Sequence, residues 1–274
     1  MTWLVVAAKD VRDAVRSRAA LVAAVALALV LAALTYGVGA LARREPEFLG
    51  DGTATTADLV GAVGGQAGWL LGAVVAIVGL VLSNEAIAGE RASGSIKILL
   101  GLPHARWHVV AGKLAGRATV AAAAVAVGTL VAAVVAVATY DAVAPLPLVG
   151  FGVATAALAS SYVGIGVGIS AAVATTRRAT AGATAAFLFF VFGWDTSLLP
   201  RALLFLVEGR LLPPDGPHWF DTATLLGPGS AYGAVVDASS PLAHDAVLGI
   251  AVLTAWTVLP PALGYLRFRG ADLT

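Results

Sequence analysis

The stretch "AALVAAVALALVLAALTYGVGAL", residues 19–41, is apolar almost throughout and carries no charged side chain. A helix needs roughly 20 such residues to cross the hydrocarbon core of a bilayer. A helix is the expected form, because each backbone amide left unpaired in lipid is costly. Five more stretches have this character, although one of them is short and ends at Trp194. We therefore expect six membrane spans, over residues 19–41, 67–83, 118–140, 146–174, 179–194 and 246–266.

The composition of the whole chain agrees with a membrane protein. Of its 274 residues, 59% are hydrophobic and 12% are charged, and the mean hydropathy is +0.90. A soluble domain is about half apolar and about a quarter charged. We find no internal repeat and no linker, so we expect residues 1–274 to form a single all-α membrane domain. The absence of cysteine excludes disulfides, thiolate catalysis and cysteine-ligated zinc.

The distribution of charge predicts which side of the membrane holds the ends of the chain. With six spans, both termini lie on the same side. If that side is the cytoplasm, 13 of the 17 Lys and Arg residues lie inside, whereas only 5 of the 16 acidic residues do. The positive-inside rule favours this arrangement. We expect a multi-pass protein of a prokaryotic plasma membrane with both termini cytoplasmic.

Two segments outside the spans carry helical patterns of their own. Residues 1–18 predict an amphipathic helix at the cytoplasmic interface, and a charged flank that anchors the topology is the alternative. Its expected apolar face is Leu4, Ala8, Val11 and Val15, and its expected polar face includes Lys9, Asp10 and Arg12. The extracytoplasmic loop 195–245 contains an apolar part, residues 197–216, that is too short and too charged to span. There we expect a surface-lying or partly embedded helix, then a second short helix in "LLGPGSAYGAVV", residues 225–236.

Small residues form a stripe around the second span. Gly64, Gly68 and Gly72 recur every four residues, so they share one face of a helix and allow another backbone to approach closely. We expect this stripe to serve helix packing within one subunit. A dimer interface or a substrate pathway is the alternative.

Motifs for catalysis or for ion coupling are missing from the sequence. No ionisable residue lies well inside a predicted span, which counts against a carrier that uses a mid-membrane carboxylate. His104 and His108 have metal-ligand spacing but no nearby third ligand, so we expect interfacial polar residues and no metal site. The pair Gly112-Lys113 has Trp107 where a phosphate-binding loop requires glycine, and no GxSxG occurs. We expect a non-catalytic chain that binds no cofactor and no nucleic acid.

The segment 84–117, between the second and third spans, is the largest expected cytoplasmic feature. Ile96, Leu99 and Leu100 have helical spacing and could dock into a groove of a partner. Gly94 and the run 101–103 bracket this stripe, which predicts a short helix with a break at each end. A second helix is expected to begin at Pro103 and to continue into the third span. A solvated connector anchored by Trp107 is the alternative.

Residues 90–117, "ERASGSIKILLGLPHARWHVVAGKLAGR", resemble the signature of ABC-2 type permeases. Residues 8–21, "AKDVRDAVRSRAAL", are similar to the elbow helix of that family. Residues 192–200 and 225–236 resemble its NosY-like branch. The resemblance implies a permease subunit of an ATP-driven ABC exporter, whose ATP and Mg²⁺ bind to a separate ATPase chain. It also implies a homodimer and a coupling surface made of Glu90, Arg91, Gly94, Lys97, Leu99, Leu100, Pro103 and Arg106.

Two other functions remain open from the sequence. The chain could be a membrane enzyme, although it lacks a nucleophile or metal constellation. It could also be an assembly subunit that transmits force from an ATPase to an extracytoplasmic partner through the loop 195–245, without carrying a solute itself. The substrate is not readable from the sequence.

Overall fold

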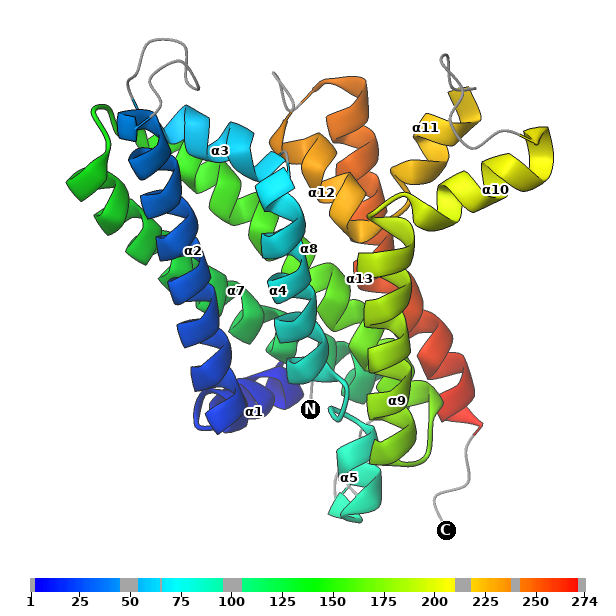
Figure 1. Cartoon of the computed structure of the whole chain (residues 1–274). Helices are drawn as coiled ribbons and strands as arrows, with labels where there is room; N and C mark the ends of the chain where they lie inside the picture. The colour runs from blue at the N-terminus through cyan, green and yellow to red at the C-terminus, as the bar shows by residue number, and fades with distance from the viewer. Residues whose placement is uncertain are drawn as a thin grey trace.

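The computed structural model describes residues 3–44, 54–64, 66–95, 105–209, 218–237 and 242–270. Every regular element within these residues is a helix, apart from one isolated bridge between Thr55 and Ala142. The long helices form a bundle, and both ends of the chain lie at one end of it, which we call the termini end (Figure 1). We call the opposite end the far end. The helices are α1 (Trp3–Val15), α2 (Arg18–Arg44), α3 (Thr56–Gly64), α4 (Gln66–Ser83), α5 (Ala88–Ala92), α7 (Arg106–Thr139), α8 (Pro145–Ala172), α9 (Thr176–Phe187), the π-helix η2 (Leu188–Trp194), α10 (Leu198–Glu208), α11 (His218–Thr224), α12 (Pro228–Val236) and α13 (His244–Arg269).

The described helices confirm a multi-pass membrane protein with five to six candidate spans. Five stretches are long and apolar enough to cross a bilayer, and they contain α2, α4, α7, α8 and α13. The sixth candidate is a bent pair, in which Thr176–Trp194 and Leu198–Glu208 meet at 62°. The predicted fifth span, residues 179–194, is the first arm of this pair. The helix that was expected to begin at Pro103 and to continue into the third span, residues 118–140, is α7, which begins at Arg106.

The helix α8 lies at the centre of the bundle and packs closely against α13. A Cβ atom on Gly164 would lie 2.5 Å from the carbonyl oxygen of Thr257, and one on Gly168 would lie 2.5 Å from the carbonyl carbon of Pro260. Small residues let helix backbones approach in this way where lipid gives no hydrophobic drive for association. The hydroxyl of Ser161 also donates a hydrogen bond to a carbonyl of α13 at 2.9 Å. The contact therefore fixes α13 on α8.

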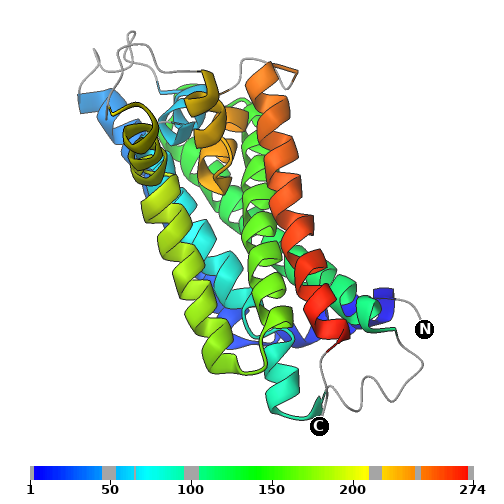
Figure 2. The same ribbon diagram turned by 90° about the vertical axis from the view of Figure 1, so that its right-hand side faces the viewer.

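At the termini end, α1 runs across the bundle and packs against α7 (Figures 1 and 2). Its buried residues are Val6, Asp10 and Ala14, whereas Leu4 and Val15 are 56% and 64% exposed. The predicted helix is therefore present, but placing Asp10 on its solvated face was wrong. Asp10 is 1% exposed, because it pairs with a cation on α7 that is distant in sequence. Of the predicted apolar face, Val11 packs against the core, whereas Leu4, Ala8 and Val15 are exposed.

Short helices cover the far end (Figure 1). The expected helix within residues 197–216 is α10, and the expected second short helix within residues 225–236 is α12. The helices α3 and α11 were not predicted, because neither has a long apolar run. Ser197, between η2 and α10, has a left-handed backbone with φ of 60°, which turns the chain sharply. The far end is thus assembled from the bent pair and three short helices.

Candidate coupling site and polar pocket

Four charged side chains meet at the termini end and join three helices. We call Asp10 of α1, Glu90 of α5, and Lys113 and Arg117 of α7 the ion cluster. The Lys113 ammonium lies 2.7 Å from the Asp10 carboxylate and 2.6 Å from the Glu90 carboxylate. The Arg117 guanidinium lies 2.8 Å from the second oxygen of Asp10. The two acids and two bases balance, so the cluster can be buried without a net charge.

Glycines on α7 allow α1 to come close enough for these pairs. A Cβ atom on Gly112 would lie 2.6 Å from the Cβ of Val6, and one on Gly116 would lie 2.9 Å from the Cβ of Asp10. Gly112 and Gly116 are four residues apart and therefore share one helix face. Any larger side chain there would push α1 away. The sequence "GKLAG", residues 112–116, thus carries both the close approach and the cation that secures it.

The helix α5 is held at its base by α8. The buried Ser170 hydroxyl accepts hydrogen bonds from the backbone N–H groups of Ile87 and Ala88, both at 3.0 Å. Arg91 donates to the carbonyl oxygen of Val173 at 3.0 Å, just beyond the end of α8. These bonds satisfy backbone groups that the turn between α4 and α5 would otherwise leave unpaired. The start of the segment 84–117 is therefore firmly attached to the bundle.

The other end of that segment is attached to α13. Arg106, at the start of α7, donates to the carbonyl oxygens of Phe268 at 2.7 Å and Arg269 at 3.0 Å. Its guanidinium lies 5.6 Å from the centre of the Phe268 ring, and that of Arg91 lies 5.8 Å from the same ring. Both distances suit cation–π attraction. The last turn of α13 therefore contacts both arms of the connection between the second and third spans.

These contacts place four of the eight predicted coupling residues. Glu90, Arg91 and Arg106 make contacts within the chain, and they hold the base of the segment. Gly94 has φ of +76°, a left-handed conformation that glycine adopts without steric cost, so it turns the chain after α5. The remaining four lie outside the described residues, and their contact with an ATPase stays a prediction: Lys97, Leu99, Leu100 and Pro103.

The sequence did not identify the partner of Glu90 in the ion cluster. It also did not identify Ser170 as the hydroxyl that holds the start of α5. The pair Gly112-Lys113 was noticed as a failed phosphate-binding motif and as part of the segment that resembles the family signature, but not as an ion-pairing site. The helix α1 carries two acids, Asp10 and Asp13, and nothing in its pattern distinguishes the buried one from the exposed one. The pattern also could not name the partner of Asp10, because Lys113 lies 103 residues further along the chain.

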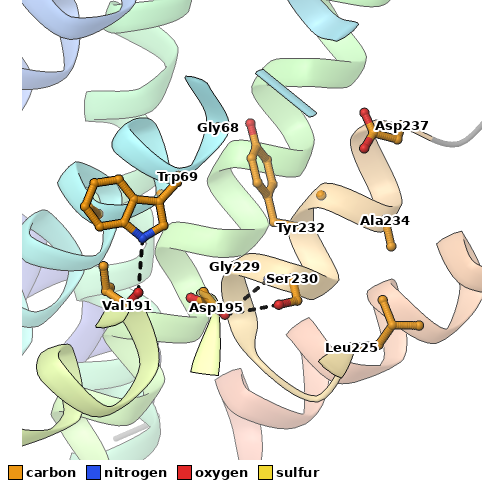
Figure 3. A pocket seen from close by; sticks show the side chains of 13 residues that line it. Gly68, Trp69, Val191, Asp195, Leu225, Gly229, Ser230, Tyr232, Ala234 and Asp237 are labelled. Carbon is orange, nitrogen blue, oxygen red and sulfur yellow. Dashed lines mark hydrogen bonds between the residues drawn. The ribbon is translucent and has the colours of Figure 1, made fainter. Parts of the chain in front are cut away.

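A second polar feature lies in the half of the bundle toward the far end. A cavity of about 350 Å³ opens between α4, the end of η2, and α12. Figure 3 shows Trp69 and Val191 on one side, Ser230 and Tyr232 of α12 with Asp237 at its end on the other, and Asp195 between them. We call this the polar pocket. Its lining residues are Gly68, Trp69, Gly72, Ala73, Val191, Asp195, Leu225, Gly229, Ser230, Tyr232, Gly233, Ala234 and Asp237.

The first turn of α12 is built around the Asp195 carboxylate. One carboxylate oxygen accepts from the backbone N–H and the hydroxyl of Ser230, at 3.2 and 3.4 Å, and the other accepts from the Tyr162 hydroxyl at 3.4 Å. Gly227 and Gly229 lie so close that a Cβ on either would clash with the carboxylate. The positive end of the helix dipole favours a negative charge in this place. The cap fixes the position of the carboxylate in the pocket wall.

The predicted glycine stripe divides between two helices. Gly64 is the last residue of α3, whereas Gly68 and Gly72 belong to α4 and line the polar pocket. A Cβ atom on Gly72 would meet no atom within 4 Å. At Gly72 the small residue therefore leaves open space at the cavity instead of receiving another backbone of the same chain.

The described residues give no support for a metal site. In the part of the chain that the structure describes, no group of three or more His, Cys, Asp or Glu residues could hold a metal ion. His104, expected with His108 as an interfacial polar residue, lies outside the described residues.

The outward face of α9 is unusually polar for a candidate span. Thr180, Ala181, Thr184 and Ala185 are all exposed and line a shallow groove with Thr176, Arg177 and Leu188. Threonine hydroxyls and alanine methyls gain little from contact with lipid tails, whereas they suit close contact with another helix.

Comparison with known families gives one finding. The family model described as "ABC-2 family transporter protein" matches residues 4–273, which is nearly the whole chain. A search of curated proteins gave no significant match.

Proposed function

This chain belongs to the ABC-2 family of transporter proteins, and we propose that it is the membrane-spanning permease subunit of an ATP-driven ABC exporter. Members of this family are typically non-catalytic membrane components that work with an ABC ATPase subunit. ATP and Mg²⁺ would bind to that ATPase and not to this chain. The observation that carries the proposal is the ion cluster, which joins α1, α5 and α7 beside the segment that resembles the family signature.

The proposed coupling follows the contacts of that segment. The ATPase would seat against residues 96–103, through Leu99 and Leu100, with Lys97 and Pro103 setting the register. A displacement of α5 would then reach α7 and α1 through the Glu90–Lys113 pair. It would reach α8 through Ser170 at the same time. Salt bridges and buried hydrogen bonds suit this role because they have one favoured geometry and do not slide as apolar contacts do.

The exposed face of α9 supports the proposed homodimer. A second copy of the chain would cover the threonines and alanines of α9 and remove them from lipid. The two copies of α9 would then lie side by side at the boundary between the subunits. Export from the cytoplasm follows the direction that the family resemblance implies.

The proposed orientation places the termini end in the cytoplasm of a prokaryotic cell. The outward apolar face of α1, with Leu4 at 56% and Val15 at 64% exposure, would lie in the lipid interface. The helix would thus act as the expected elbow, apolar toward lipid and ion-paired toward the bundle. The NosY-like assignment rests on the resemblance of residues 192–200 and 225–236 alone.

The proposal is tested at Leu99 with the ATPase that co-purifies from native membranes. We expect Leu99→Asp to abolish coupling in reconstituted vesicles, because a carboxylate would enter the apolar contact with the ATPase. Membrane insertion should be unchanged. Leu242→Asp is the matched control, since it adds the same charge at an exposed position far from residues 96–103. Transport that proceeds normally in Leu99→Asp vesicles would contradict the proposal, and coupled ATP hydrolysis without solute movement would favour the force-transmitting subunit.

A further inference from the structure

We propose that the polar pocket binds a small organic cation, an ammonium or guanidinium with a short aliphatic body, through Asp195. The inference deepens the proposed function, on which it rests only in that the bound cation would be cargo of the permease. Binding itself can be measured on the chain alone.

The charge of the pocket is uncompensated. Asp195 accepts hydrogen bonds from Tyr162 and Ser230, but no Lys, Arg or His nitrogen among residues 3–44, 54–64, 66–95, 105–209, 218–237 and 242–270 forms an ion pair with it. Asp237 also lines the pocket and has no ion pair within the same ranges. A carboxylate held within a membrane bundle without a counter-ion is costly and is usually kept for function. A cation that enters the pocket would supply the missing charge.

An aromatic wall adds a second feature that suits a cation. Trp69 is 41% exposed and lines the pocket. Its indole N–H donates to the carbonyl oxygen of Val191 at 3.1 Å, and its ring meets Phe192 edge-on with centroids 5.6 Å apart. The ring is therefore held in place before a ligand arrives. Indole is the best side chain for cation–π attraction, which strengthens when the cation is desolvated.

The size and the remaining lining select an organic cation over a metal ion. About 350 Å³ lies in the lower range of small-molecule sites and far exceeds the volume of a bare ion. Val191, Leu225 and Ala73 offer apolar surface to an aliphatic body. In the described residues no third acid, histidine or cysteine joins the two carboxylates to complete a metal site. An anion would meet both carboxylates and is excluded on charge.

The alternative role of Asp195 is purely structural, as the cap of α12. A cap alone requires no free volume, no exposed indole and no second carboxylate. If Asp195 is only a cap, a titrated cation will not bind in the pocket. If Asp195 also receives a ligand, the cation will bind saturably. Gly72 gives a way to close the pocket without touching the cap. A side chain at that position meets open space, so leucine there would fill the cavity while leaving the Ser230–Asp195 bonds in place.

The test uses the full chain in lipid nanodiscs, without the ATPase, and three probes of equal length: n-butylammonium, n-butanol and butyrate. Binding is measured by calorimetry and by tryptophan fluorescence, with empty nanodiscs as the blank. We expect n-butylammonium to bind saturably and more weakly as salt is raised, and the neutral and anionic probes not to bind. Asp195→Asn should raise the Kd at least tenfold, and Asp221→Asn, an exposed acid on α11, should leave it unchanged.

Two further variants keep the proposal falsifiable if Asp195→Asn fails to fold. Gly72→Leu should abolish binding while the thermal midpoint stays near that of the unaltered chain, and Trp69→Leu should weaken binding several-fold. Equal binding of butyrate, or unchanged binding in both pocket variants, would overturn the proposal. Since no ATPase is present, these results are independent of Leu99→Asp. A chain that binds the cation yet shows no coupling to an ATPase would overturn the proposed function alone.

Discussion

Lys113 contacts two carboxylates from two other helices while only 4% of its surface is exposed. Its removal would leave Asp10 buried with Arg117 alone and Glu90 with no cation from the ion cluster. A buried ion pair adds little net stability by itself, but deletion of one partner leaves an uncompensated charge. The residue is therefore a sensitive position in the chain even though it touches no ligand.

We expect Lys113→Met, which keeps the length of the side chain, to destabilise the protein by about 3–5 kcal/mol. The measurement is the thermal unfolding of the purified chain in detergent. Lys9→Met is the matched control, since Lys9 pairs with Asp13 at 3.0 Å on the exposed face of α1. An exposed pair of this kind contributes about 0–1 kcal/mol. Equal losses in the two variants would show that the ion cluster is not structurally important.

The sequence could not reveal that Asp10 and Glu90 pair with Lys113, and the reason is physical. Helical spacing arranges residues on faces of one helix, and it places Leu4, Ala8 and Val11 together correctly. It does not say which face meets the bundle and which meets lipid, because both environments are apolar. A membrane helix can therefore bury Asp10 against a distant lysine and turn its leucine outward, as α1 does.

Among the elements, the long helices were predictable and the short ones were less so. A run of about 20 apolar residues is a strong indication, because lipid admits few other backbone structures. The helix α3 lacks such a run and was missed. The early start of α7 was predictable, since proline and glycine at residues 101–103 mark a helix boundary and the helix begins at Arg106. The polar pocket needs α4, η2 and α12 together, and no local pattern predicts that meeting.

At the same scale, the outward face of α9 leads to a test of the homodimer. We expect the double variant Thr180→Leu and Thr184→Leu to convert dimers into monomers, because it replaces polar contacts with side chains that lipid solvates well. Native mass spectrometry from mild detergent measures the change. Val134→Leu, on the exposed face of α7, is the control and should leave the dimer intact. Persistence of the dimer in the double variant would exclude this face as the interface.

For the molecule as a whole, the strongest expectation concerns orientation. The chain has no cysteine, so a single introduced thiol reports its own side of the membrane. We expect a membrane-impermeant maleimide to label Asp221→Cys on intact cells and to label Arg12→Cys only after lysis. Both positions are exposed and they lie at opposite ends of the bundle. The reverse pattern would place the segment 84–117 outside, where no ATPase could reach it.

The contacts of Phe268 have a consequence for the connectivity of the bundle. Arg91 precedes the undescribed part of the segment and Arg106 follows it, and both reach the same ring at the end of α13. The last helix is thereby fixed to the middle of the chain, at the two described residues that flank the connection between the second and third spans. A small molecule bound beside Phe268 would disturb α5, α7 and the end of α13 together, which makes this corner a promising place to inhibit the protein.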